Sequence, residues 1–331
     1  MDGGSDRSLL GKISWNYYVD GLTQKEIGER LGLSRLKIVR LLKRARAEGV
    51  VEIRIAPDVR LNTELARSLE DRFHLQEAIV TDPVDDPEIR SAIGRAGAQY
   101  LERSLKDDLV LGIGMGRTVS SILAAMIPRK LDNITIRTLA GAYEEPGLHS
   151  NAYNIAWRLA DLLGATCEQL YCPLIVPDQA TREALLKDRT LHELLESVSA
   201  CDMVLVGLGA LDSDSPLIRL GYVSQDQLAE LRSAGAAGEI LGRFYDFQGN
   251  PLLTEFDQRT LGIDLEQLCE VETVIALAHG PNKIGPMLGA LRTGCINVLI
   301  TDRWTAESVL VRDDLSRAES VATRIETRTS T

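Results

Sequence analysis

The chain has few cysteines, few aromatic residues and no long apolar run. Its 331 residues are 5% aromatic and include five cysteines, Cys167, Cys172, Cys201, Cys269 and Cys295. Five scattered cysteines exclude a disulfide-rich scaffold and fit a reducing compartment, so we expect all five in the protein core as buried thiols. No run approaches the roughly 18 to 20 apolar residues of a membrane span, and the start Met1-Asp2-Gly3-Gly4 lacks a signal-peptide pattern. We therefore expect a cytoplasmic protein.

Charge is distributed unevenly along the sequence. The net charge is −11 and 44% of the residues are apolar, as in a soluble globular protein. Residues 1–60 nevertheless contain twelve Lys or Arg against eight Asp or Glu and carry +4, whereas residues 61–331 carry −15. A short basic segment joined to a large acidic one is typical of a DNA-binding module attached to a second domain.

Three short helices are predicted near the amino terminus. Apolar residues at three- and four-residue spacing indicate a first helix from about Ser8 to Val19. Thr23 and Glu26 have the spacing of a capping box at the start of a second helix. Ser34 is a suitable N-cap for a third helix from about Arg35 to Ala47. The short turn between the second and third helices predicts a helix-turn-helix.

The third predicted helix has a basic surface, and we expect Leu36, Val39 and Leu42 on its inner face. Six Lys and Arg residues occur in it before the first acidic residue, Glu48, and such a surface suits the major groove of DNA. Residues 50–55 alternate between apolar and charged and predict a strand that forms a wing. The residues that we expect to contact double-stranded operator DNA are Thr23, Gln24, Ser34, Arg35, Lys37, Arg40, Lys43 and Arg44.

One such module contacts too few phosphates for tight binding at physiological salt. Specific binding therefore needs at least a dimer on repeated half-sites, and the rest of the chain must provide the oligomer contacts. We expect residues 1–56 to form the winged helix-turn-helix and residues 57–331 to form a sensing and oligomerisation domain. Residues 57–88 are expected to supply a linker helix and a first strand, followed by a turn at residues 85–87.

Beyond residue 88, apolar strands alternate with helices. Strands are expected at residues 109–113, 134–139, 203–208, 273–278 and 297–300, and helices at residues 119–126, 154–163 and 284–291. This alternation is typical of a mostly parallel α/β sheet. Ligands of such sheets bind beyond the carboxyl ends of the strands.

The loops at these strand ends suit a phosphorylated sugar or a polyol. Gly112 to Thr118 places three glycines, an Arg and a Thr before a helix, where free N–H groups favour an anion. His279 to Lys283 adds a lysine at a second helix start, and Gly207 to Ala210 forms another glycine loop. Asp246, between aromatic residues, can accept hydrogen bonds from hydroxyl groups. Singly, these features are more often a tight turn, a surface lysine and a turn-capping carboxylate, but together they favour a ligand site.

These features together resemble the SorC family of bacterial transcription regulators. The resemblance covers nearly the whole chain and is most specific at Tyr18 to Ile27, at Gly112 to Thr118, and at Lys283 with Leu288 to Asp302. It implies an α/β protein with an N-terminal (winged) helix-turn-helix. It also implies a larger Rossmann-like effector domain related in fold to glucosamine-phosphate and ribose-phosphate isomerases.

By the resemblance, the Gly114 to Thr118 loop and Lys283 hold the effector phosphate, and Asp246 meets a hydroxyl group. The family often has paired glycines where this chain has Gly141-Ala142 and His279-Gly280, so the pocket differs there. The resemblance also implies a tetramer that is a dimer of dimers. The expected effector-binding residues are Gly114, Gly116, Arg117, Thr118, Gly141, Asp246, His279 and Lys283.

We therefore expect a transcriptional regulator of carbohydrate or polyol catabolism whose operator affinity is controlled by a phosphorylated sugar or polyol. We expect no catalytic residue, metal, cofactor or membrane contact. Two alternatives remain. One is a sugar-phosphate isomerase or lyase with a fused DNA-binding module, in which Asp246, His279 and Lys283 act as acid and base. The other is a DNA-binding oligomer whose pocket is vestigial.

Overall fold

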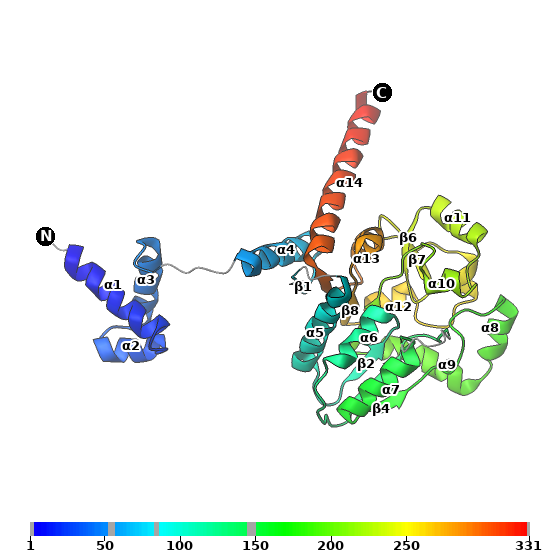
Figure 1. Ribbon diagram of the computed structural model, residues 1–331, viewed down its shortest axis with the longest axis horizontal. Coiled ribbons are helices and arrows are strands. Elements are labelled where there is room, and N and C mark those ends of the chain that lie inside the picture. Colours follow the sequence, from blue (N-terminus) through cyan, green and yellow to red (C-terminus); the bar gives the residue numbers. More distant parts are fainter. Residues whose placement is uncertain (1–2, 52–56, 83–85, 144–149, 330–331) are drawn as a thin grey trace. The chain divides into compact units, whose positions relative to one another are not determined.

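The computed structural model describes residues 3–51, 57–82, 86–143 and 150–329. The chain divides into two compact units, Met1–Val59 and Arg60–Thr331 (Figure 1). In the described part of the chain, no helix is both long enough and apolar enough to cross a bilayer.

The described part of the first unit contains the three predicted helices, α1 (Gly3–Tyr18), α2 (Gln24–Leu31) and α3 (Arg35–Ala47). The predicted capping box is present, because Thr23 Oγ1 accepts the Glu26 N–H at 3.3 Å and Glu26 Oε2 accepts the Thr23 N–H at 2.7 Å. Gly32 ends α2 with φ of 64°, in the left-handed region that favours glycine. Ser34 Oγ accepts the Lys37 N–H at 3.3 Å and caps α3.

The predicted inner face of α3 is wrong at two of its three positions. Leu42 is buried as expected, but Leu36 is 63% exposed and Val39 is 39% exposed. The buried stripe consists instead of Ile38, Leu42 and Ala45, which share one face at i, i+4 and i+7. Because apolar residues occur on several sides of this helix, their spacing alone does not fix its rotation about its axis. Of the predicted wing, residues 50–51 form a bend, and residues 52–55 lie outside the described residues.

The second unit is built on a parallel sheet of seven strands in the order β1-β9-β8-β5-β2-β3-β4. This confirms the predicted mostly parallel α/β sheet. The strands are β1 (Glu77–Thr81), β2 (Val110–Ile113), β3 (Thr135–Thr138), β4 (Thr166–Glu168), β5 (Met203–Gly207), β8 (Thr273–Leu277) and β9 (Val298–Asp302). A separate antiparallel pair consists of β6 (Ala236–Ile240) and β7 (Arg243–Asp246).

The helices of the second unit follow the strands along the chain. The α-helices are α4 (Pro57–Phe73), α5 (Asp86–Ser104), α6 (Arg117–Ser120), α7 (Ala152–Leu163), α8 (Gln179–Leu185), α9 (Arg189–Glu196), α10 (Pro216–Arg219), α11 (Gln225–Ser233), α12 (Leu265–Glu270), α13 (Ile284–Arg292) and α14 (Arg303–Thr329). The 3-10 helices are η1 (Ser121–Ala124), η2 (Ser197–Ala200), η3 (Glu255–Gln258) and η4 (Pro281–Lys283).

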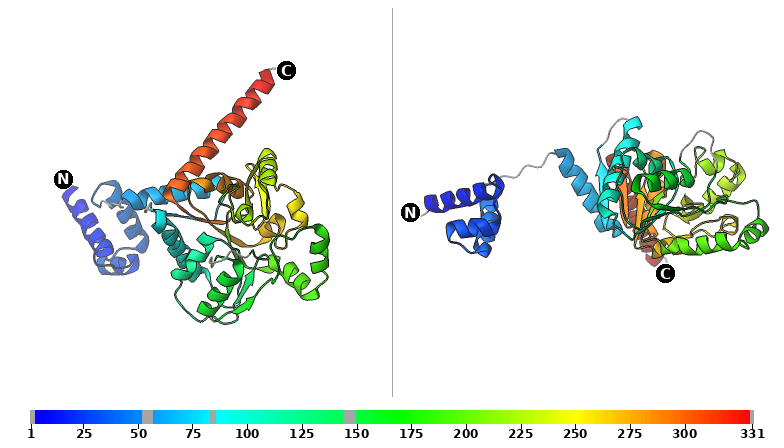
Figure 2. Two further views of the ribbon diagram at one scale, coloured as in Figure 1. Left: turned by 45° about the vertical axis from the view of Figure 1, so that its right-hand side comes forward. Right: turned by 90° about the horizontal axis from the view of Figure 1, so that it is seen from below.

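Both faces of the sheet are covered, as a parallel sheet requires (Figure 2). Val204 and Val206 of β5 pack into a core that includes residues of α4, α13 and α14. Met203 and Leu205 point to the opposite side, into a core that includes residues of α5 and α7. Successive side chains of a strand point to opposite faces of the sheet, and both faces are buried here. The central strands are therefore continuous runs of apolar residues.

Helix α5 replaces the turn that the sequence predicts at residues 85–87. The helix begins at Asp86, directly before Pro87, while Asp85 lies outside the described residues. Proline is compatible with the first turn of a helix because its missing N–H would have no intrahelical acceptor there. The Asp-Pro sequence is thus a helix start in this context, although the same residues are also common in turns.

The expectation that all five cysteines are buried thiols is wrong. Cys269 lies exposed in α12 and forms a disulfide with buried Cys295. Cys167 is half-buried. Only Cys172 and Cys201 are buried free thiols, and burial raises the pKa of each to about 11. Cys269 and Cys295 are far apart in sequence and meet only through the tertiary fold, which spacing does not reveal.

Candidate DNA-binding helix and effector site

The outward face of α3 combines basic and apolar side chains. With Ile38 and Leu42 against the core, Leu36, Arg40 and Lys43 lie on the opposite side of the helix and are exposed. Arg35 and Lys37 are exposed on the flanks of this face. The exposed leucine adds an apolar contact surface of the kind that meets thymine methyl groups, and the sequence prediction did not include it.

Arg44 differs from the other basic residues of α3 because it already has acidic partners. Its guanidinium forms ion pairs with Asp6 and Glu48, each at 2.5 Å. The hydrogen bonds that Arg44 donates to Glu48 and Asp6 raise its pKa. A phosphate contact by Arg44 therefore competes with two intramolecular ion pairs.

Three predicted DNA contacts lie at helix starts. Thr23 and Ser34 are exposed, but their hydroxyl groups already accept the N–H groups of Glu26 and Lys37 as caps. Gln24, the first residue of α2, is half-buried. The N-terminal N–H groups of such helices are suited to a DNA phosphate.

The predicted glycine loop connects β2 to α6. The Gly114 N–H donates to the Leu205 carbonyl of β5 at 2.8 Å, and a Cβ on Gly114 would lie 3.0 Å from that oxygen. Gly116 has φ of 123°, which side chains rarely adopt, and its N–H donates to the Ser150 carbonyl at 2.8 Å. Gly114 thus lets the loop lie directly on β5, and Gly116 provides the backbone conformation of the turn. Arg117, exposed, and Thr118, half-buried, then open α6, where the first N–H groups have no intrahelical acceptor.

Lys283 lies at the start of α13 among other charged groups. Burial lowers its pKa, the charges of Glu239 and Asp212 raise it, and the charge of Arg117 lowers it further. Asn282 Nδ2 donates to Asp212 Oδ2 at 3.1 Å and joins the loop after β8 to the loop after β5. The Lys283 charge therefore interacts with one other cation and two carboxylates, and Arg117, Asp212 and Lys283 follow β2, β5 and β8, which are neighbours in the sheet.

Sequence analysis missed both carboxylates of this site, Asp212 and Glu239. The Glu239 backbone exchanges hydrogen bonds with Gly209 at 2.8 and 3.1 Å, and Glu239 Oε2 accepts the Gly242 N–H at 2.8 Å. A Cβ on Gly209 would overlap the Glu239 carboxylate, so a larger residue there would displace that side chain. Burial raises the pKa of Glu239, while the Gly242 N–H and Lys283 oppose the shift. The one available signal for Glu239 was an acidic residue isolated within an apolar stretch, residues 236–241.

Asp246 lies apart from these charges. It ends β7 in an antiparallel hairpin, not in a loop after a strand of the parallel sheet. Its Oδ1 accepts the N–H groups of Gln248 and Asn250 at 2.9 and 2.8 Å, so the carboxylate caps its own turn. A Cβ on Gly289, in the middle of α13, would lie 2.7 Å from the Asp246 carbonyl oxygen. The structure therefore places Asp246 beside the second half of α13, away from Lys283 at its start.

Two further predicted residues follow strands of the parallel sheet. Gly141 follows β3, and its N–H donates to the Leu261 carbonyl at 2.8 Å. A Cβ there would overlap the Pro173 carbonyl, so this glycine is required by packing. His279 follows β8 and is half-buried. The predicted residues that the structure brings to one edge of the sheet are Gly114, Gly116, Arg117, Thr118, Gly141, His279 and Lys283.

Comparisons with known proteins agree with both units. Residues 58–311 match the family model described as "Putative sugar-binding domain", and residues 16–48 match "Sigma-70, region 4". The sorbitol operon regulator of Klebsiella pneumoniae is 30% identical over 319 residues, covering 94% of this chain and 100% of that protein. The erythritol catabolism regulatory protein EryD of Brucella abortus is 29% identical, covering 92% of this chain and 97% of that protein.

A solved structure extends the likeness to three dimensions. The crystal structure of the full-length sorbitol operon regulator SorC from Klebsiella pneumoniae has a TM-score of 0.71 and 29% identity, and covers 92% of this chain and 99% of that chain. The likeness thus includes both the helix-turn-helix and the α/β unit. The chain belongs to the SorC family of transcriptional regulators, which carry a sugar-binding domain behind a DNA-binding helix-turn-helix.

Proposed function

We propose that a phosphorylated sugar or polyol binds at the carboxyl ends of β2, β5 and β8, and that its binding changes the affinity of α3 for operator DNA. The observation that carries the proposal is the convergence of Lys283 and Arg117 with the glycine loop. The names of two relatives, a sorbitol operon regulator and an erythritol catabolism regulator, support an effector of the sugar and polyol class.

The two kinds of charge in this site suit two parts of one ligand. Lys283, Arg117 and the first N–H groups of α6 are positioned to bind a phosphate group. Glu239 and Asp212 lie close to Lys283 and are suited to accept hydrogen bonds from hydroxyl groups. The site thus distinguishes a sugar phosphate from inorganic phosphate by its carboxylates, and from a free polyol by its cations.

Replacing Glu239→Gln tests this division. The amide keeps an acceptor for the Gly242 N–H but removes a negative charge beside Lys283. We expect affinity for a sugar phosphate to rise about fivefold, since roughly 1 kcal/mol of repulsion is removed. Affinity for the matching unphosphorylated polyol should fall. Calorimetric titration measures both, with exposed Glu230→Gln as the control. An equal loss for both ligands would contradict the assignment of phosphate to the cations.

The outward face of α3 predicts different effects for a cation and for an apolar residue. Arg40→Ala should weaken binding to all duplexes and reduce the slope of log affinity against log salt by about one. Leu36→Ala should leave this slope unchanged and relax the preference at one base pair by at most the roughly 1–3 kcal/mol that a mismatched base pair costs. Fluorescence anisotropy with a duplex selected from a random pool measures both. A reduced salt slope for Leu36→Ala would contradict the base-contact role.

We infer that the domain binds its effector and releases it unchanged, because the relatives are named as regulators. Glu239 and Lys283 lie together as an acid and a base would in an isomerase, so the inference needs a direct assay. Purified protein incubated with ribose-5-phosphate or glucosamine-6-phosphate should yield no product. Turnover that disappears in Lys283→Ala would establish an enzyme instead.

We propose that the functional unit is a cytoplasmic homo-oligomer. A helix-turn-helix that reads repeated half-sites needs at least two copies. A tetramer built as a dimer of dimers would present two such pairs.

A further inference from the structure

We propose that helix α14 is a self-association element, and that an exposed stripe along it pairs with the same stripe of a second copy of this chain. The stripe consists of the half-buried Ser308 and the exposed Trp304, Val311, Leu315 and Ala318. The proposal rests on the DNA-binding function only for the choice of a second copy of this chain as the partner of the stripe. Its test measures molar mass without DNA or effector.

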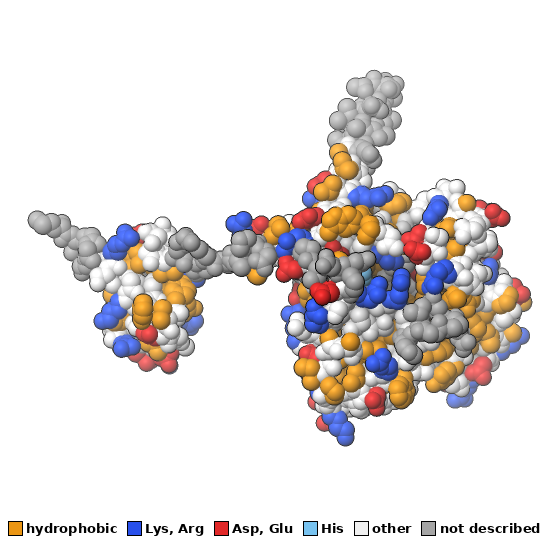
Figure 3. Space-filling model, viewed as in Figure 1, with side chains coloured by type: hydrophobic (Ala, Val, Ile, Leu, Met, Phe, Trp, Pro, Cys, Tyr) orange, Lys and Arg blue, Asp and Glu red, His pale blue; other side chains and the backbone are white. Residues whose placement is uncertain are grey.

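Helix α14 has two different apolar faces. On one face, Ala306, Val309 and the fully buried Asp313 pack against the domain. On the opposite face, Trp304, Val311 and Leu315 are 48%, 59% and 61% exposed. A monomeric surface helix normally shows a polar outer face, so this second apolar stripe indicates a partner. Figure 3 shows hydrophobic side chains gathered on the surface at the base of α14.

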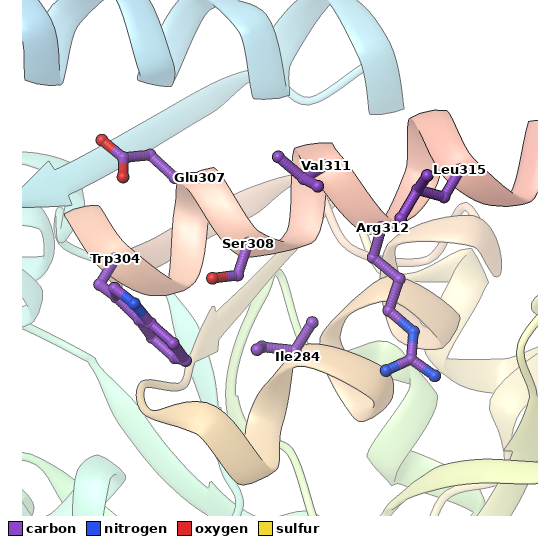
Figure 4. A pocket seen from close by; sticks show the side chains of 7 residues that line it. All are labelled: Ile284, Trp304, Glu307, Ser308, Val311, Arg312 and Leu315. Carbon is purple, nitrogen blue, oxygen red and sulfur yellow. The ribbon is translucent and has the colours of Figure 1, made fainter.

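A groove runs along the stripe at its base. A cavity of about 510 Å³ lies between α14 and the start of α13, and Trp304, Ser308 and Ile284 face it (Figure 4). Arg312 forms part of the same lining and stacks on the Phe247 ring, with 5.1 Å from its guanidinium carbon to the ring centroid. The groove gives a second helix an apolar floor and a charged rim.

The spacing of the stripe identifies the occupant as another helix. Its residues follow one another at intervals of four, three, four and three, which is the a/d repeat of a coiled coil. The same spacing continues in the sequence at Ala322 and Ile325, so the pattern spans three heptads. Glu307 and Arg312 flank the stripe at g and e positions, where opposite charges of two parallel helices meet. A parallel pair of identical helices therefore satisfies both the apolar and the charged positions.

The length of the helix supports pairing with a second copy. The sugar-binding family model ends at residue 311, whereas α14 runs from Arg303 to Thr329 and projects from the domain (Figures 1 and 2). An isolated helical segment is marginal in water without packing of its apolar face. A second copy is present at equal concentration and supplies the same spacing, and operator binding itself requires more than one copy.

The test is the molar mass of the full chain by light scattering over a dilution series, for wild type and for Val311→Glu/Leu315→Glu. Both positions are exposed, so the variant should fold, which circular dichroism and melting temperature check. We expect the dissociation constant of the pair to rise at least about 100-fold, because each pair loses four buried apolar side chains. The variant should therefore show half the molar mass of wild type.

Leu253→Glu is the matched control, because Leu253 is 90% exposed and lies outside the stripe. It should leave the molar mass unchanged. A wild-type chain that is monomeric at every concentration overturns the proposal. A folded double variant with the same molar mass and dissociation constant as wild type also overturns it and assigns the oligomer contacts to another surface. Neither result bears on effector binding at Lys283.

Discussion

Lys283→Ala should shift the response of operator binding to much higher effector concentration while leaving operator affinity without effector unchanged. Lys283 adds a full charge at the start of α13, and burial lowers its pKa, so its ammonium group is incompletely hydrated. Loss of a charge-assisted hydrogen bond costs about 1.5–3 kcal/mol, which corresponds to roughly a 10- to 150-fold loss of effector affinity. The measurement is anisotropy of labelled operator during titration with a sugar phosphate.

Lys187→Ala provides the control, since Lys187 is exposed and lies outside the site. It should respond to the effector as wild type does. A normal response from Lys283→Ala would remove Lys283 from the site and, with it, the assignment of phosphate to this edge of the sheet. Weaker operator binding by Lys283→Ala without effector would instead show that the residue acts on the fold.

Asp313→Ala should cause a large loss of stability. Asp313 is fully buried in α14 and accepts hydrogen bonds from Arg72 of α4 at 2.8 Å and from Arg292 of α13 at 2.6 Å. Arg317 is a third partner, at 2.7 Å. Removing the carboxylate leaves partly buried guanidinium groups without their charge partner, which costs about 3–5 kcal/mol. In a domain of this size the melting temperature should fall by roughly 6–20 °C, as measured by calorimetry.

Asp314→Ala is the neighbouring control, because Asp314 also pairs with Arg72 but is 63% exposed. An exposed ion pair contributes about 0–1 kcal/mol. Equal losses for the two variants would contradict the role of Asp313 as the buried link between α4, α13 and α14.

The buried Asp313 carboxylate also predicts how the stability of the fold depends on pH. Burial tends to raise the pKa of Asp313, but hydrogen bonds from Arg72 and Arg292 outweigh it, and the pKa is lowered. A carboxylate with a lowered pKa stabilises the fold above its unfolded pKa of about 4 and loses this contribution as pH falls through the folded value. The stability difference between wild type and Asp313→Asn should therefore shrink below about pH 4. A difference that stays constant to lower pH would contradict the lowered pKa.

Local sequence signals were sufficient to predict the helix-turn-helix. The orientation of α3 about its own axis, in contrast, could be assigned only from the tertiary structure. Thr23 and Glu26 interact within one helical turn, so their spacing was sufficient to predict the capping box. Leu36 and Val39 were misassigned because α3 carries apolar residues on several sides, and the choice of inner face depends on its packing with α1 and α2. The outward orientation of Leu36 therefore follows only from that packing.

In the effector site too, some residues could be placed from the sequence pattern, while others depend on contacts between distant segments. The glycine loop and Lys283 follow strands of the parallel sheet, so the alternation of strands and helices placed them at one edge. Asp246 is held by N–H groups within four residues of itself, an interaction that competes with any ligand. Glu239 lies near enough to Lys283 for their charges to interact because a β-bridge joins Glu239 of the β6–β7 hairpin to Gly209, and no periodicity indicates that proximity.

The most direct test of the account is the dissociation constant of wild-type protein for its selected operator, measured with and without a panel of three- to six-carbon sugars and polyols in phosphorylated and free forms. We predict that at least one phosphorylated member changes this constant by roughly 5- to 150-fold and raises the melting temperature of the protein. A panel in which no member changes either quantity would contradict effector control and leave a DNA-binding oligomer with an unused pocket.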